Sequence, residues 1–226
     1  MEKFKLTYDR VFSKTHFSSH DLYIRFLDKE YDENCGWGFS ALSLNGTLIS
    51  GSYLQKIKRY YQVWNAENEC LDKMSYLIVK EIKFFLDIEK SYIIVQGGIG
   101  DMNSLKTAFR QFLWGEFTYE AITLDVFSFL LGLLNDKMLV GIEEVCFSDV
   151  VIQDRFVGKY IATPTALTND IDSLKLIKGI LEKTKVRISI ENYIYGVSIS
   201  SNNTYMLNGT DDCVIAFINY LISKTC

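Results

Sequence analysis

Two carboxylates, Asp28 and Glu30, stand two positions apart in the stretch FLDKEYD, just before a glycine-containing turn. Residues 22–30 alternate between apolar and polar side chains as a β-strand does, and the two acids continue the apolar row. The pattern predicts a strand whose core-facing side ends in two carboxylates. Carboxylate oxygens that face inward together are typical ligands of Mg²⁺ or Mn²⁺.

Two further acids begin predicted helices on their apolar sides. Asp101 follows the turn at 97–100, and apolar residues stand four, seven and eight positions after it. Asp170 has apolar residues four, seven and eleven positions after it. Both acids are therefore expected to point toward the core.

Buried together, four like charges would either take up protons or cost several kcal/mol each, unless cations lie between them. Asp28, Glu30, Asp101 and Asp170 therefore predict a site for two Mg²⁺ or Mn²⁺ ions, and the sequence has no His or Cys cluster that would favour zinc. Each acid also has a simpler explanation. Asp101 could be an N-cap or first-turn acid favoured by the helix dipole, and Asp170 could be the same with Thr168 or Asn169 as cap. Asp28 and Glu30 could end a strand that frays into solvent.

The elements expected to position these acids form an α/β domain, with a mixed sheet covered by helices. Strands are predicted at 22–30, 37–44, 47–54, 91–98 and 121–124, and Asn45-Gly46 marks a hairpin. Helices are predicted at 65–87, 100–114, 125–135, 140–147 and 168–184. Residues 1–185 would form this domain, with its core at about 20–185. Residues 186–226 would add a strand pair, 186–191 and 194–200, which 203–207 can join, and a helix capped by Thr210 or Asp211.

The composition is that of an ordinary globular protein: 226 residues, 48% of them apolar, with a formal net charge of −4. No signal peptide is visible and the apolar runs are too short to cross a bilayer, so a cytoplasmic protein with no membrane association is expected. The five cysteines are scattered and show no metal-ligand spacing. The net negative charge does not favour binding of a long nucleic-acid duplex. It does not exclude a metal-dependent nuclease, because acids that bind metal ions would themselves contribute to the negative charge.

Three stretches together resemble the DEDD superfamily of 3′-to-5′ exonucleases, whose fold is ribonuclease H-like. They are FLDKEYD, followed by a predicted hairpin, then YIIVQGGIGDMNSL, and finally TALTNDIDSLKLIKGIL. The order and spacing match over about residues 20–185. The resemblance implies a mixed sheet, with an antiparallel hairpin beside parallel strands.

The same resemblance implies hydrolysis of phosphodiester bonds at the 3′ ends of single-stranded RNA or DNA by a two-metal mechanism. Asp28 would bridge the metal ions, with Glu30, Asp101 and Asp170 completing their shells. Gly98 would allow the terminal nucleotide to approach closely, and Trp37 or Phe39 would stack on a base, although such aromatic residues more often belong to a core.

One departure from the family concerns the general base. Members place a His five residues, or a Tyr four residues, before the last Asp, where this chain has Thr165 and Ala166. Since threonine accepts no proton near neutral pH, either Tyr160 or His20 would substitute as the base, or metal-bound hydroxide would suffice at a lower rate.

Two other readings therefore stay open. The chain could be a catalytically degenerate relative that acts as a binding or regulatory module. It could also be an unrelated interaction protein, whose acids are helix caps. The C-terminal extension could form a homodimer or recruit a protein partner.

Overall fold

In the computed structural model, which describes residues 2–15, 17–152, 156–165, 168–191 and 193–224, the chain is built mainly from β-strands. Eleven strands of these residues form one sheet in the order β2-β3-β4-β5-β1-β11-β10-β9-β7-β8, and β6 pairs with β1. The strands are β1 Glu2–Ser13, β2 Trp37–Asn45, β3 Leu48–Asn65, β4 Cys70–Asp87, β5 Tyr92–Gln96, β6 Phe117–Glu120, β7 Leu139–Ile152, β8 Phe156–Ala162, β9 Ile180–Ile190, β10 Tyr193–Ser200 and β11 Thr204–Gly209.

Every ladder between these strands is antiparallel. The predicted α/β fold, a ribonuclease H-like sheet with parallel strands, is therefore wrong. Parallel strands need crossover connections, which are usually helices. The helices predicted at 65–87 and 140–147 are instead strands that pair with their neighbours.

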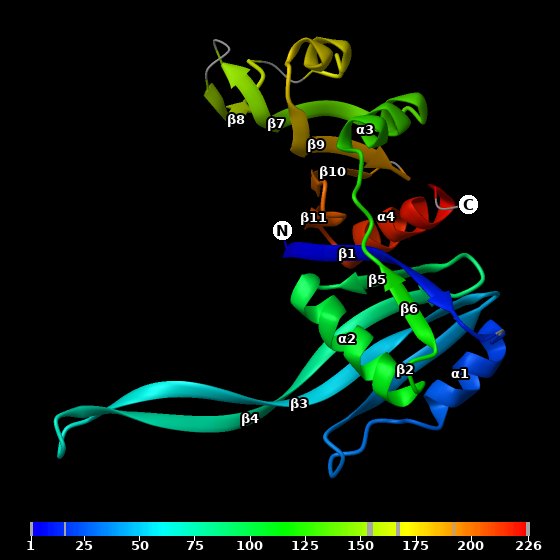
Figure 1. Ribbon diagram of the computed structural model, residues 1–226, viewed down its shortest axis with the longest axis vertical. Helices are drawn as coiled ribbons and strands as arrows, with labels where there is room; N and C mark the ends of the chain where they lie inside the picture. The colour runs from blue at the N-terminus through cyan, green and yellow to red at the C-terminus, as the bar shows by residue number, and fades with distance from the viewer. Residues whose placement is uncertain (1, 16, 153–155, 166–167, 192, 225–226) are drawn as a thin grey trace.

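Helices cover the two faces of this sheet at its two ends (Figure 1). The helical segments are α1 Ser19–Leu27, α2 Ile99–Phe112, α3 Val126–Asn135, the short 3₁₀ helix η1 Asp172–Leu176 and α4 Asp211–Lys224. On the central strand β5, Ile93 and Val95 pack in the core beneath α1 and α2, whereas Tyr92 and Ile94 pack with α3 and α4 on the other face. The sheet thus joins an N-terminal half (β1–β6, α1, α2) to a C-terminal half (β7–β11, α3, α4).

A cluster of phenylalanine rings fixes α1 and α2 on the N-terminal half. The ring centroid of Phe26 in α1 lies 4.7 Å from that of Phe39 in β2 and 5.1 Å from that of Phe109 in α2. All three side chains are fully buried. Aromatic rings at these separations attract each other beyond simple area burial, so the cluster holds both helices against the strands.

Residues 19–27 form helix α1, so the predicted strand at 22–30 is wrong. Leu22 and Phe26 are both buried, and their spacing of four residues fits a helix as well as it fits a strand. A capping box at Ser18 favours the helix. The Ser18 hydroxyl accepts a hydrogen bond from the Asp21 N–H, 3.1 Å away, and the Asp21 carboxylate accepts hydrogen bonds from Ser18.

The predicted helices at 65–87, 140–147 and 168–184 are also wrong. The first is strand β4, which pairs with β3 from Ile49↔Leu86 to Asn65↔Cys70. The second lies in β7, and the third comprises η1 and the start of β9. Burial on one face of the sheet favours the strand in the last part of β4, whereas residues 70–79 are a strand because they pair with β3 in the hairpin. The predicted strand at 121–124 is absent from the described residues there, and β6 lies just before it.

Other predicted elements are confirmed. Gly46, with φ +61°, forms the turn of the β2–β3 hairpin. Strand β5, helices α2 and α3, the strands β10 and β11 and the helix α4 lie close to their expected positions. The predicted domain boundary after residue 185 falls inside β9. No helix among the described residues is long and apolar enough to cross a membrane.

The β3–β4 hairpin extends far beyond the rest of the sheet (Figure 1). Strand β2 pairs with β3 only as far as Gln55, and β5 pairs with β4 only from Lys83 onward. We call the projecting part, residues 56–79, the arm. Within the described chain, the two strands of the arm pair only with each other.

Candidate ligand site between the two halves of the sheet

The four predicted metal ligands lie in separate parts of the structure. Asp28 caps the C-terminal end of α1 and Glu30 lies in the segment that follows; both are exposed. Figure 1 shows α1 and the yellow segment that holds Asp170 at opposite ends of the molecule. The described residues hold no group of three or more His, Cys, Asp or Glu side chains placed to bind one ion. The catalytic and metal-binding roles of these acids, and the two Mg²⁺ or Mn²⁺ ions, stay predictions.

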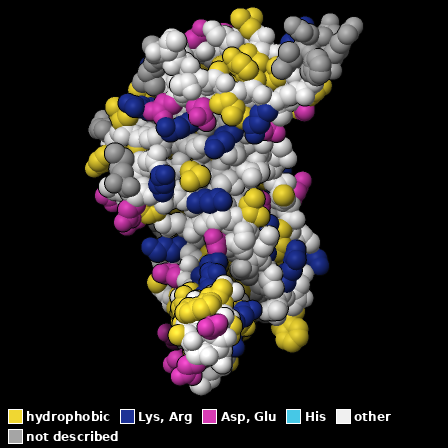
Figure 2. Space-filling view, turned by 90° about the vertical axis from the view of Figure 1, so that its left-hand side faces the viewer, with side chains coloured by type: hydrophobic (Ala, Val, Ile, Leu, Met, Phe, Trp, Pro, Cys, Tyr) yellow, Lys and Arg dark blue, Asp and Glu magenta, His cyan; other side chains and the backbone are white. Residues whose placement is uncertain are grey.

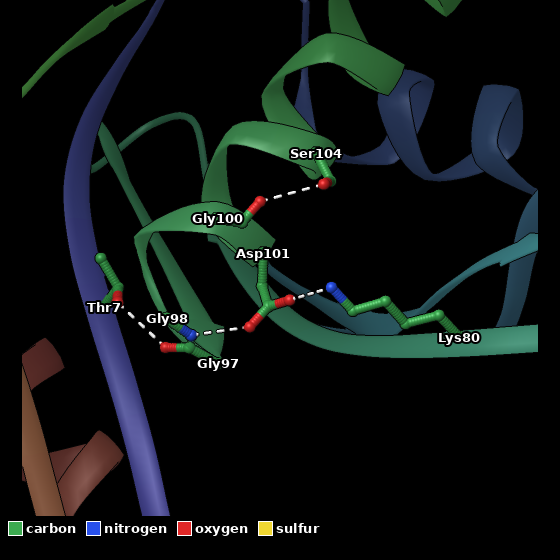
Figure 3. A network of polar contacts seen from close by, with 7 residues as sticks. All are labelled: Thr7, Lys80, Gly97, Gly98, Gly100, Asp101 and Ser104. Atoms are coloured by element: carbon green, nitrogen blue, oxygen red, sulfur yellow. Dashed lines mark hydrogen bonds and ion pairs between the residues drawn. The ribbon is translucent and has the colours of Figure 1, made fainter. Parts of the chain in front are cut away.

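Asp101 stabilises the start of α2 (Figure 3). Its carboxylate accepts a hydrogen bond from the Gly98 N–H at 2.7 Å and forms an ion pair with Lys80 of β4. Burial raises the pKa of Asp101, but the hydrogen bonds from Lys80 and Gly98 outweigh it and leave the pKa below its usual value. Thr7 of β1 donates to the Gly97 carbonyl at 2.9 Å, which holds the same turn on the sheet.

Asp170 precedes η1 and bonds locally. Its carboxylate accepts hydrogen bonds from the hydroxyl and the N–H of Ser173, which lower its pKa. Its own N–H donates to the Thr168 hydroxyl at 3.1 Å. Asp101 and Asp170 thus have the capping contacts that the simpler explanation expected.

The predicted substrate contacts and bases are equally dispersed. Phe39 is fully buried among core rings, and Trp37 is partly buried beneath the Lys29 ammonium group, 4.4 Å from its ring centroid. Gly98 is the N-cap of α2. Tyr160 lies exposed on β8 and His20 lies exposed on α1. Ala166 lies outside the described residues.

A cavity of about 540 Å³ opens where the two halves of the sheet meet. Its walls come from β1, the β4–β5 turn, the segment before α3, α3 itself, the β10–β11 turn and the end of α4. The lining residues are Tyr8, Arg10, Phe12, Lys90, Ser91, Ile122, Leu124, Phe129, Asn203, Tyr205, Leu221 and Lys224. Ligand sites in proteins favour such junctions, and the volume suits a small molecule.

The floor of the cavity contains a buried amide. Asn203 is 1% exposed, and its Oδ1 accepts a hydrogen bond from the Tyr205 hydroxyl at 2.7 Å. Its Nδ2 has no hydrogen-bond partner among the described residues. A buried polar group without a partner costs about 1–3 kcal/mol, so this amide has a strong preference for an acceptor.

The backbone keeps Asn203 in this place. The residue adopts φ +56°, a left-handed conformation that asparagine tolerates better than most residues. Its carbonyl accepts a hydrogen bond from the Tyr8 N–H at 3.2 Å, and its N–H donates to the Ser200 carbonyl at 3.0 Å. The β10–β11 turn therefore holds the amide rigidly against β1.

The mouth of the cavity is cationic. Arg10 and Lys90 are exposed and form no ion pair with any described residue, whereas Lys224 contacts Asp136 at 2.7 Å. Burial raises the pKa of Tyr205, so the floor stays uncharged near neutral pH. A small anion at the mouth would find three positive side chains, with Asp136 beside Lys224 and Glu120 opposite Arg10 across β1 and β6.

Sequence patterns did not point to this cavity. Arg10, Lys90 and Lys224 are far apart in the chain, and no motif joins them. Asn202-Asn203 indicates a turn, which is confirmed, but a turn signal says nothing about the amide of Asn203.

The charge on the face shown in Figure 2 gives no support for the predicted partner, single-stranded nucleic acid. Over the upper part of Figure 2, which is the C-terminal half, Lys and Arg side chains lie among Asp and Glu. Lys185 and Arg187 of β9 each contact Glu143 at 2.6 Å. These contacts reduce the positive charge available to phosphates, and nucleic-acid binding stays a prediction.

Comparison with known protein families finds no match, and comparison with curated proteins finds none either.

Proposed function

We propose that this protein is a ligand-binding module whose cavity between the two halves of the sheet takes a small organic anion. The observations that carry the proposal are the cavity, with Arg10 and Lys90 at its mouth and Asn203 in its lining, and the buried Nδ2 of Asn203, which has no hydrogen-bond partner among the described residues. A ligand that presents an acceptor to the amide and an anionic group to the mouth would satisfy both.

The lining indicates the chemistry between these two ends. Tyr8, Phe129 and Tyr205 contribute aromatic rings, and Ile122 and Leu124 contribute apolar side chains. An aromatic or other flat apolar body fits this wall better than a polar chain does. The proposed ligand is therefore a flat organic molecule with a carboxylate or phosphate group.

Thermal unfolding in the presence of adenosine 5′-monophosphate, phenyl phosphate, benzoate and neutral benzamide tests the proposal. We expect at least one anion to raise the unfolding temperature, because a ligand at a hundred times its Kd adds about 2.7 kcal/mol of stability. Benzamide should have no effect. The Arg10→Gln/Lys90→Gln variant should lose the response.

A matched control removes two charges elsewhere. Lys3 and Lys178 are exposed and lie outside the cavity lining, so Lys3→Gln/Lys178→Gln should respond like the unaltered protein. If benzamide stabilises as well as benzoate, or if both double variants respond alike, the cavity is not an anion site.

The exonuclease activity that the sequence resemblance implies stays a prediction. Release of label from a 3′-labelled oligonucleotide in the presence of Mn²⁺, abolished by Asp28→Ala, would support it against the binding module proposed here.

A further inference from the structure

The arm has one face whose side chains are mainly apolar. This face, which we call face A, comprises Ile57, Arg59, Tyr61, Val63 and Asn65 of β3 and Cys70, Asp72, Met74, Tyr76 and Ile78 of β4. Tyr61 and Tyr76 contact each other diagonally across the strands, with ring centroids 5.7 Å apart. Face A is thus an apolar stripe along the arm that contains two side chains of opposite charge, Arg59 and Asp72.

No described part of the chain covers face A. Tyr61, Met74 and Tyr76 are 46%, 50% and 51% exposed. A two-stranded ribbon alone is only marginally stable in water, and contiguous apolar patches on a protein surface commonly mark contact sites. The arm therefore gains stability when another surface packs on face A.

The order of residues on face A makes it complementary to itself. Tyr61↔Met74 is the central row, Val63↔Asp72 is the next row toward the tip, and Arg59↔Tyr76 is the next row toward the body. A two-fold axis across the central row would place each tip-side row on the body-side row of a second copy. With the axis along this row, β4 lies over β4 of the second copy, so Asp72 would lie diagonally opposite Arg59 of that copy, within reach of its long side chain, and the reverse contact would form by symmetry.

The charges of the whole arm agree with this arrangement. Lys58 and Arg59 lie near the body, with Lys56, which contacts Glu33 at 3.7 Å, whereas Glu67 and Glu69 lie at the tip, close to Asp72. Lys73, on the face opposite to face A, is the one positive side chain in the tip half of the described arm. Neither Arg59 nor Asp72 forms an ion pair with a described residue. If two arms packed in opposite directions, the acidic tip of each arm would lie beside the positively charged segment near the body of the other copy.

We propose that face A binds a second copy of this chain, with the two arms antiparallel across a two-fold axis. Ten residues of ribbon span about 33 Å, which places the contact at the small end of protein interfaces. The dimer is therefore expected to dissociate on dilution.

Sedimentation equilibrium tests the charge pairing directly. Arg59→Glu alone and Asp72→Arg alone should each raise the dimer dissociation constant about tenfold or more. The double variant Arg59→Glu/Asp72→Arg should return it to within a few-fold of the original, because the pair is then reversed. Loss of association in the double variant equal to the sum of the single losses would overturn the pairing.

The opposite face of the arm provides a control. Trp64 and Leu77 point away from face A and are 61% and 59% exposed, so Trp64→Ser and Leu77→Ser should leave association unchanged, whereas Tyr61→Ser should abolish it. A protein that stays monomeric at all concentrations, or equal losses on both faces, would overturn the proposal.

A cysteine at the expected axis gives an independent measurement. Cys35 and Cys70 are exposed, so both would first be changed to serine. In that background Met74→Cys, in the same row as Tyr61, should form an intermolecular disulfide on mild oxidation, whereas Leu77→Cys should not. Equal cross-linking at both positions would contradict the two-fold arrangement.

Discussion

Lys106 of α2 forms an ion pair with Asp9 of β1, and the two side chains are only 12% and 11% exposed. The Lys106 ammonium also lies 5.2 Å from the ring centroid of Tyr119 in β6. One charged pair thus fastens a helix to the strand that joins the two halves of the sheet. Because both charged groups are largely removed from water, removal of either one would leave the other charge buried without its partner, which costs stability.

Asp9→Asn should destabilise the protein by about 3 kcal/mol, because Lys106 would keep its charge in a nearly buried place without a partner. The double variant Asp9→Leu/Lys106→Met should cost less than the single change, since apolar groups can fill the same space. Urea unfolding monitored by circular dichroism measures both. A double variant less stable than Asp9→Asn would contradict this account.

Gly38→Ala should destabilise the fold by about 1–3 kcal/mol through overpacking. A Cβ at this position would lie 2.4 Å from the Tyr31 Cα and 2.6 Å from the Glu30 carbonyl oxygen, and backbone cannot easily move. Gly132, within α3, is the control: a Cβ there meets nothing within 4 Å, so Gly132→Ala should stabilise by about 0.5–1 kcal/mol. Thermal unfolding should give the two changes opposite signs.

Asp101→Asn should cost about 1 kcal/mol of stability, the usual effect of weakening a helix cap, with some loss of the Lys80 contact. Asp28→Asn should be close to neutral, since Asp28 is exposed and forms no ion pair with a described residue. Chemical unfolding of the two variants, side by side, tests this difference. Equal costs would mean that Asp28 has a contact equivalent to that of Asp101.

The end of α4 should loosen in acid. Hydrogen bonds, first from Lys224 and then from the Tyr220 hydroxyl at 3.0 Å, hold the pKa of Asp136 below its usual value. A lowered pKa in the folded state stabilises the fold above the usual aspartate pKa of about 3.9, and this contribution falls as the pH drops through the folded-state pKa. The protection factors of the α4 amides, which are corrected for the intrinsic pH dependence of hydrogen exchange, should therefore fall below about pH 4, and Asp136→Asn should remove that dependence.

Local signals in the sequence predicted some elements well. Asn45-Gly46 needs a positive φ, which specifies the β2–β3 hairpin without help from distant contacts. The glycine turn before Asp101 and the apolar spacing after it gave α2 almost to the residue. These elements depend on residues that are close together in the chain, so local sequence patterns are sufficient to predict them.

Segments whose partners are distant were predicted poorly. In β4, Ile82, Phe84 and Leu86 alternate and are buried because they face the aromatic core, yet the exposed apolar residues of the arm also give a helical spacing. The cavity shows the same limit. Asn203, Arg10 and Lys90 come together only because β1 pairs with both β5 and β11, and no short pattern encodes that pairing.

The pairing of Glu2 with Gly209 across β1 and β11 carries a kinetic consequence. During synthesis, β1 must remain without one neighbour until nearly all of the intervening chain has left the ribosome. Contacts so distant in sequence slow folding and leave apolar strand surface open in the meantime. Nascent chains halted before β11 should therefore bind chaperones, whereas the released protein should not.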